Sequence, residues 1–215
     1  MRKRNAHLLS NYFVVALILI GLVGLMGCSE TPSKTDGTMN DDEKTGLISA
    51  LDAYDQAKSE IQDWNNGFRI ARIHHFGTSE YAENAKETSW EFYVESADGE
   101  VSTDFTYTVG SGITKATDTP YSTGRNTCLP EEITVDSTEA AAIALTAIKT
   151  NQFPNFDGGC KAELLVNENG TPYWEITANS QRKDGSIDLN IPAKYGYVEI
   201  NAKTGEVITV TGDTS

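Results

Sequence analysis

The sequence predicts an α+β fold of two tandem units, in which each unit packs one helix on an antiparallel sheet of three to four strands. Two observations favour this class. A helical pattern followed by several short β patterns occurs twice within the 215 residues. The two runs also share local sequence, because Trp90-Glu91-Phe92 matches Trp174-Glu175-Ile176 and the stretch that begins at Phe105 matches the one that begins at Val198.

The first predicted unit, residues 45–118, begins with an amphipathic helix. Its apolar residues recur every three or four positions. Asn65-Asn66-Gly67 follows them, and glycine is the usual residue just after a helix C-terminus. β-branched and aromatic residues then mark the strands. The helix stripe consists of Leu47, Leu51, Tyr54, Lys58, Ile61 and Trp64, and strands are expected at 68–76, 89–96, 101–109 and 113–117.

The second predicted unit, residues 132–215, follows a linker at 119–131 and repeats this order. Asp136 to Glu139 are typical of a helix N-terminus, where acidic side chains favour the positive end of the helix dipole. Asp184 to Asp188 are interpreted as a solvated loop. The helix is expected at 139–149 and the strands at 161–167, 173–178, 195–201 and 206–211.

The second unit resembles a PepSY domain. The resemblance rests on the stretches DSTEAAAIALTAIK, YWEITA and YGYVEINAKTGEVITV and covers about residues 132–212. The closing motif has Asn201 where the family frequently has Asp. Residues 45–118 resemble the family only weakly, since Gly110-Ser111-Gly112 stands where Thr-Gly-Glu is expected. The resemblance implies a cystatin-like helix-on-sheet fold and an inhibitory or partner-binding role, without a shared active site. Other family members include propeptides of thermolysin-type proteases and spore-envelope proteins.

The first 27 residues have the pattern of a signal peptide. Three basic residues precede an apolar run from Tyr12 to Met26. As a helix this run spans only about 22 Å, less than the roughly 30 Å hydrocarbon core of a membrane, which favours a cleaved signal over a membrane helix. Leu25-Met26-Gly27-Cys28 resembles the lipobox of prokaryotic lipoproteins. The resemblance implies lipidation of Cys28 with diacylglycerol, including chains such as palmitate. An ordinary signal anchor with an incidental cysteine is the alternative.

The predicted location is the cell membrane or the outer membrane, on the extracytoplasmic side. Residues 28–44 are polar and are interpreted as a flexible tether between the lipid and the folded body. The net charge of −14 argues against a nucleic-acid partner, since phosphate binding needs clustered Lys and Arg. Cleavage removes three basic residues and no acidic one, so the mature chain carries −17, and anionic lipid headgroups should repel it.

The cysteines and histidines do not predict a catalytic or metal centre, and no cofactor is expected. Outside the cytoplasm, Cys128 and Cys160 are most simply a disulfide. A metal site and a catalytic thiol are weaker alternatives, because no histidine lies nearby in the sequence and no Cys-x-x-Cys motif is present. His74 and His75 are adjacent on a predicted strand, so their side chains point to opposite faces and cannot easily bind one ion together.

Aromatic residues on two central strands form a candidate binding face: Trp90, Phe92, Tyr93, Tyr173 and Trp174. Because neighbours on a strand alternate faces, one set must pack under the helix. The other set lies on the open face of the sheet, where it is either covered or left as a binding surface. Arg69, Arg72 and Arg125 either anchor an anionic partner or pair with neighbouring carboxylates.

These observations predict a non-catalytic cell-envelope lipoprotein that binds or inhibits a protein partner, with a secreted peptidase as one candidate. Two other classes stay open. One is an extracytoplasmic sensory module that binds a small ligand or a peptide. The other is a hydrolase that uses carboxylates such as Glu91 and Glu175.

Overall fold

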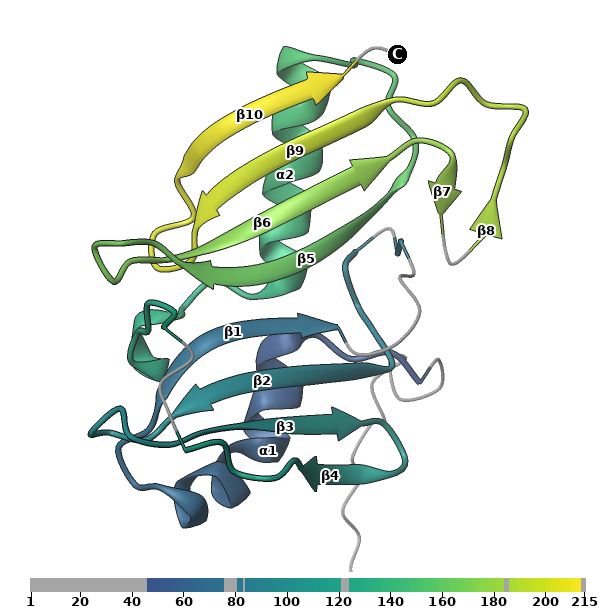
Figure 1. The fold of residues 1–215 in the computed structure, drawn as a ribbon. Helices are drawn as coiled ribbons and strands as arrows, with labels where there is room; N and C mark the ends of the chain where they lie inside the picture. Colours follow the sequence, from purple (N-terminus) through teal and green to yellow (C-terminus); the bar gives the residue numbers. More distant parts are fainter. Residues whose placement is uncertain (1–45, 76–80, 83, 121–123, 184–185, 214–215) are drawn as a thin grey trace, which may run out of the picture. The chain divides into compact units, whose positions relative to one another are not determined.

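Eight strands form one antiparallel sheet, and two helices pack on one of its faces (Figure 1). This computed structural model describes residues 46–75, 81–82, 84–120, 124–183 and 186–213, which lie within one compact unit. The strand order is β10-β9-β6-β5-β1-β2-β3-β4. The predicted α+β class is therefore confirmed, whereas the strands of the two predicted units lie in a single sheet.

The first half of the chain supplies α1 and half of the sheet. α1 (Ala50–Trp64) begins later than the apolar pattern indicates, because the Ser49 side chain accepts a hydrogen bond from the Asp52 N–H and so caps the helix. The strands form a meander in which each pairs with the next: β1 (Arg69–His75), β2 (Ser89–Glu95), β3 (Ser102–Thr108) and β4 (Gly112–Lys115).

The second half also supplies one long helix and four strands of the sheet, with one addition. α2 (Ser137–Asn151) follows a short 3-10 helix, η2 (Pro130–Glu132). Where the sequence predicts a loop at 184–188, residues 182–183 and 186–187 pair as two short strands outside the eight-stranded sheet. The remaining strands are β5 (Gly159–Val166), β6 (Pro172–Asn179), β7 (Arg182–Lys183), β8 (Ser186–Ile187), β9 (Tyr195–Asn201) and β10 (Val207–Asp213).

The two halves meet where β1 pairs with β5. The pairing places Ile73 opposite Leu164 and His74 opposite Glu163. Without it, both strands would be sheet edges with unpaired N–H and C=O groups, which tend to find another strand. Buried residues of both halves also belong to one hydrophobic cluster. The division into two cystatin-like units therefore stays a prediction.

The two matched tryptophans occupy equivalent places in the two halves. Trp90 on β2 and Trp174 on β6 are both fully buried. Each indole N–H donates to the carbonyl oxygen of a residue just before a helix: Trp90 to Ile48 at 2.9 Å and Trp174 to Val135 at 2.7 Å. A buried indole N–H needs such a partner. Each bond therefore fixes a helix start to the central part of the sheet.

The N-termini of α1 and α2 meet at Asp136. This carboxylate accepts hydrogen bonds from the Ser137 N–H at 2.6 Å and from the Leu51 N–H at 3.0 Å. The Ser137 hydroxyl in turn accepts from the Ala50 N–H at 3.1 Å. The first N–H groups of a helix lack partners within the helix and form its positive end. Asp136 thus accepts hydrogen bonds from the positive N-termini of both helices, which would otherwise face each other without an acceptor between them.

We expect Asp136→Ala to lower the free energy of unfolding by about 2 kcal/mol, because each lost helix cap costs about 1 kcal/mol. Asp136→Asn keeps an acceptor oxygen and should cost much less. Ser49→Ala removes a cap from α1 alone and serves as the reference, with an expected loss of about 1 kcal/mol. Urea unfolding measures all three. Equal losses in Asp136→Ala and Ser49→Ala would contradict a role at both helices.

The predicted disulfide between Cys128 and Cys160 is not formed. Cys128 pairs with Ile70 near one end of β1, whereas Cys160 lies near the start of β5, beyond the other end of the β1–β5 pairing. The register separates them by about seven residues, or roughly 23 Å along the strands, and a disulfide needs Cα atoms within about 7 Å. Burial raises the pKa of Cys128 to about 12, so this thiol stays protonated.

We expect thiol titration of the denatured, unreduced protein to find two thiols from these residues. We also expect the same melting temperature with and without a reductant. A lipidated Cys28 is a thioether and does not react. No thiol in the denatured protein, together with a lower melting temperature after reduction, would contradict the separation of Cys128 from Cys160.

No helix among the described residues is long and apolar enough to cross a membrane. The predicted signal peptide, Cys28 and the tether at 28–44 lie outside the described residues, so their predictions stay as stated.

Candidate functional site

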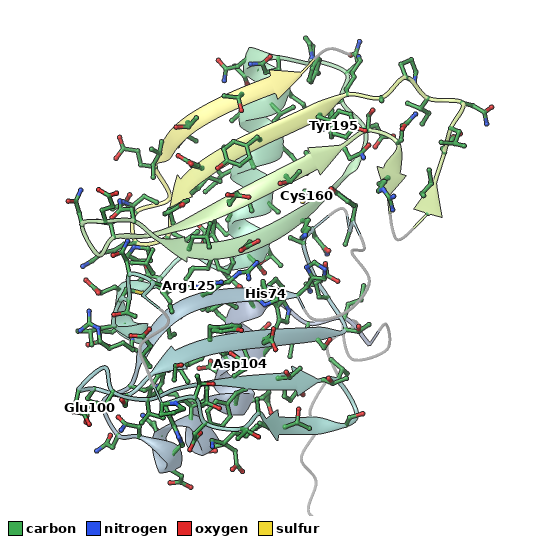
Figure 2. All side chains as sticks on the ribbon, viewed as in Figure 1. His74, Glu100, Asp104, Arg125, Cys160 and Tyr195 are labelled. Atoms are coloured by element: carbon green, nitrogen blue, oxygen red, sulfur yellow. The ribbon has the colours of Figure 1, made fainter. Side chains whose placement is uncertain are left out.

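The sheet face opposite the two helices is the candidate site, and we call it the helix-free face (Figure 2). Strand alternation produces it, because residues next to the buried ones point away from the helices. It carries polar and aromatic side chains that are half-buried. Its charged members include Glu91, Asp104, Glu163, Glu175 and Glu199, with Arg72, Lys161 and Arg125 among the cations.

Four of these carboxylates, together with His74, form a row across five neighbouring strands. The pairing registers place Glu199 of β9 opposite Glu175, Glu175 of β6 opposite Glu163, Glu163 of β5 opposite His74, and His74 of β1 opposite Glu91 of β2. Side chains directly opposite one another lie about 5 Å apart at Cβ, and like charges in such positions are unfavourable. The row therefore needs partners that offset its negative charge.

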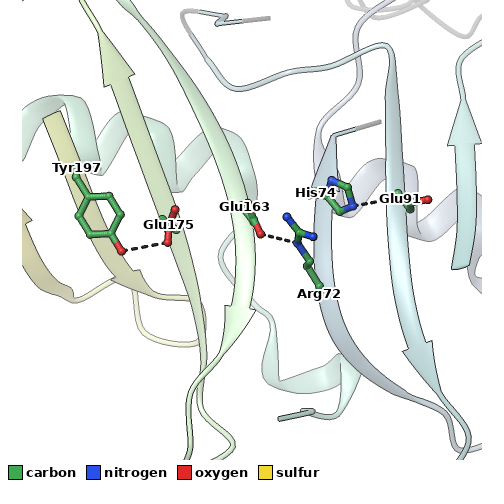
Figure 3. A network of polar contacts seen from close by, with 6 residues as sticks. All are labelled: Arg72, His74, Glu91, Glu163, Glu175 and Tyr197. Atoms are coloured by element: carbon green, nitrogen blue, oxygen red, sulfur yellow. Dashed lines mark hydrogen bonds and ion pairs between the residues drawn. The ribbon is translucent and has the colours of Figure 1, made fainter. Parts of the chain in front are cut away.

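Three contacts involve the side chains of the row, and among them only Arg72 brings a positive charge (Figure 3). The Arg72 Nε donates to Glu163 Oε1 at 2.5 Å. The His74 Nε2 lies 2.7 Å from Glu91 Oε2, although the ring makes no well-directed hydrogen bond to it. The Tyr197 hydroxyl lies 3.1 Å from Glu175 Oε2 and 2.9 Å from Glu199 Oε1.

The contact at Tyr197 is incomplete. A phenol has one proton to donate, yet two carboxylates lie within hydrogen-bonding distance of it. Burial raises the pKa of Tyr197 far above its usual value, and the hydrogen bond to Glu199 adds to this, so the proton stays on the phenol. The pair Glu175 and Glu199 thus has acceptor oxygens to spare for a cation.

The other end of the row holds a neutral histidine. Burial lowers the pKa of His74 to about 4, and the nearby Arg72 adds to this effect. Burial also raises the pKa of Glu91, with a further contribution from Asp104. At neutral pH the His74–Glu91 contact therefore joins an uncharged imidazole to a carboxylate, which does not amount to a full ion pair.

The two carboxylates of the hydrolase hypothesis do not lie together. Glu91 on β2 and Glu175 on β6 are separated by β1 and β5, so their strands are about 14 Å apart. Carboxylate pairs that hydrolyse glycosides are separated by at most about 9.5 Å. Within the described part of the chain, no group of three or more His, Cys, Asp or Glu residues is placed to hold a metal ion.

The residues of the predicted aromatic face divide between the two sides of the sheet. Trp90, Phe92 and Trp174 are fully buried under the helices. Tyr93 and Tyr173 lie half-buried on the helix-free face, and Arg125 lies over the Tyr93 ring at 5.1 Å.

The other predicted site residues are also placed. Arg69 donates to Thr127 at its hydroxyl and its carbonyl oxygen, and Arg72 belongs to the row. The rings of His74 and His75 are nearly perpendicular, at 82°, and His75 is buried.

Glu163, Glu199 and Tyr197 are not among the site residues predicted from the sequence. A signal for them was present, because a glutamate stands between apolar residues in the middle of several predicted strands, as in Ala162-Glu163-Leu164 and Val198-Glu199-Ile200. Such a position places the carboxylate on the face opposite the core.

An apolar groove lies on the helix side of the sheet, between one flank of α2 and the start of β10. It has a volume of about 530 Å³, and α2 and the first residue of β10 form its walls. Its lining residues are Glu139, Ala142, Ile143, Thr146, Ala147, Thr150, Asn151 and Val207. A second groove of about 440 Å³ lies at the β1–β5 junction and includes Arg72 and Arg125.

A structural similarity exists to a protein from Clostridium difficile 630, CD1622, which is provisionally described as a lipoprotein. Its crystal structure matches with a TM-score of 0.45 and 13% sequence identity, covering 74% of this chain and 92% of that chain. A likeness at this level establishes no common function. No protein-family model matches the chain, and no curated protein matches it significantly, so the PepSY resemblance is not confirmed.

The neutral state of His74 gives a prediction for the pH dependence of stability. Between pH 6.5 and 4 an unfolded histidine takes up a proton that folded His74 does not, so the free energy of unfolding falls as the pH falls. The raised pKa of Glu91 acts in the opposite direction. We expect His74→Gln to reduce this fall by up to about 3 kcal/mol.

Urea unfolding at several pH values measures this effect. The pKa of His75 is lowered as well, chiefly by burial, so His75→Gln, measured separately, accounts for the remaining slope. An unchanged slope in His74→Gln would contradict the assignment.

Proposed function

We propose that this protein is a lipid-anchored, non-catalytic envelope protein of the PepSY type that binds a protein partner through the helix-free face. The observation that carries the proposal is the broad sheet face with half-buried tyrosines and a row of glutamates. Tyrosine is enriched in protein interfaces because it offers a large contact area together with a hydroxyl. The anchor at Cys28 and the two-unit repeat are parts of the same proposal and rest on the sequence.

The position of the aromatic residues favours a protein partner over a small ligand. Small-molecule pockets are concave and mostly lined by apolar and aromatic side chains. Trp90 and Trp174, which would have been the main aromatic walls of such a pocket, are fully buried in the core. Tyr93 and Tyr173 instead lie on different strands of an extended surface, β2 and β6.

The charge of the face favours a partner with a basic surface. Glu175 and Glu199 share a single phenolic proton from Tyr197, so an arginine or lysine from a partner would complete their hydrogen bonds. The net charge of −14 acts in the same direction at longer range, because it speeds encounter with positively charged proteins. A secreted peptidase with such a surface is the candidate that the PepSY resemblance suggests.

Capture from envelope extract with the full-length protein tests the proposal. We expect Glu175→Gln/Glu199→Gln to weaken retention of a specific protein about tenfold, which corresponds to about 1.4 kcal/mol. We expect Tyr173→Ala to weaken it as well. Asp55→Asn/Glu60→Gln removes the same charge from exposed positions on α1 and should leave retention unchanged.

Equal retention by all variants would refute binding through the helix-free face. If Asp55→Asn/Glu60→Gln weakens retention as much as Glu175→Gln/Glu199→Gln does, retention depends only on net charge. This result would also count against the proposal.

A further inference from the structure

We propose that the partner docks with an extended segment that adds to β10 as a ninth strand, and that this segment alternates apolar with basic side chains. The inference rests on the proposed function and makes it more specific. Three features of the described residues carry it: an open sheet edge, an apolar groove on one side of that edge, and acidic acceptors on the other.

The two edges of the sheet differ in how they are protected. β4, at one edge, has four residues and carries Lys115, and Thr119 pairs with Ser102 just beyond it. β10, at the other edge, has seven residues and no charge from Val207 to Gly212. A bulge interrupts its pairing only between Val207 and Thr209. No strand among the described residues pairs with its outer side, and such an edge is a template for another chain.

The helix side of this edge is apolar. α1 has its buried residues on one stripe, but α2 also has a second apolar flank, where Ala142 is exposed and Ile143 and Ala147 are half-buried. Together with Val207 this flank forms the groove of about 530 Å³. In a strand added to β10, every second side chain would point to this side. Apolar side chains of moderate size fit the groove.

The opposite side of the edge leads to the carboxylates. Thr209 pairs with Glu199 and Thr211 pairs with Tyr197, so β10 presents short threonines to the helix-free face. Glu199 lies on β9, about 10 Å from an added strand. A lysine or arginine can pass over the threonines and reach the pair Glu199 and Glu175. Strand addition of this kind takes affinity from backbone hydrogen bonds and specificity from alternate side chains.

Charge also separates this occupant from a second copy of the chain. β10 and the groove carry no cation, Glu139 is part of the groove lining, and Glu206 directly precedes β10. Pairing of two copies at this edge would bring acid against acid, and the net charge of −14 on each chain opposes it further. A basic segment of another protein meets no such repulsion.

Two peptides of identical composition test the alternation. One is Lys-Val-Lys-Val-Lys-Val-Lys and the other is Lys-Lys-Lys-Lys-Val-Val-Val. Titration against the full-length protein at fixed ionic strength should give at least tenfold tighter binding of the alternating peptide. Amide hydrogen exchange of Thr209 to Asp213 should slow when this peptide is bound. Equal affinities, or unchanged exchange in β10, would overturn the inference.

A pair of variants separates packing in the groove from attraction by charge. Ala142→Glu/Thr146→Glu makes the groove polar and adds two negative charges. Strand addition predicts at least fivefold weaker binding of the alternating peptide, whereas charge attraction alone predicts stronger binding. Gln56→Glu/Gln62→Glu adds the same charges at exposed positions on α1 and should not weaken binding. Melting temperatures and circular dichroism confirm that each variant is folded.

The two proposals can fail separately. If Glu175→Gln/Glu199→Gln abolishes partner capture but the groove variant binds the alternating peptide as the original protein does, the face stands and the added strand is wrong. If neither substitution has an effect, both proposals fail. Sedimentation of the protein alone tests whether two copies pair at this edge. If the protein is a dimer and Ala142→Glu/Thr146→Glu is a monomer, the edge binds a second copy of the chain. This result would overturn the inference.

Discussion

The arrangement of the whole sheet depends on the meeting of two helix N-termini at Asp136. Each helix presents partly positive N–H groups there, and without an acceptor between them the two ends would repel. Asp136 accepts from both helices, and the Ser137 hydroxyl accepts from α1. The strand pairing at the junction covers two residues on each side. The carboxylate therefore adds a polar link between two halves that also share this pairing and one hydrophobic cluster.

The tryptophans show why each helix lies where it does on its strands. Each indole binds the carbonyl group just before a helix, and each ring fills the space between helix and sheet. This link runs from one residue in the sequence to the position of a helix. It also brings Asp136, which follows Val135 directly, to the place where α1 begins.

The sequence was informative where the pattern is local, and the strand predictions agree with the structure to within a few residues at most ends. The matched Trp-Glu segments lie on β2 and β6, and both tryptophans are buried. Hydrophobic periodicity does not indicate which strands pair between the two halves, because nothing in the sequences of β1 and β5 marks them as partners. The single sheet could therefore not be predicted. The disulfide prediction failed because it used only cysteine number and compartment, whereas the register places the two thiols at opposite ends of the junction.

The site was predictable in part. Alternation separated Tyr93 and Tyr173 from the buried tryptophans in principle, but only the structure fixed which set faces the helices. The glutamate row needed the registers of four strand pairs, which no local pattern contains. The role of Tyr197 could not be predicted, because it depends on the position of its hydroxyl between two carboxylates on neighbouring strands.

The small β1–β5 junction has a mechanical consequence. If the lipid holds the first half of the chain and a bound protein pulls on the far edge of the second, tension crosses the sheet at right angles to its strands. Neighbouring strand pairs resist with six to eight matched residues, whereas this junction has two on each side. Its strand pairing would therefore yield before that of the others, and the Asp136 link and the shared hydrophobic cluster would then carry the load between the halves.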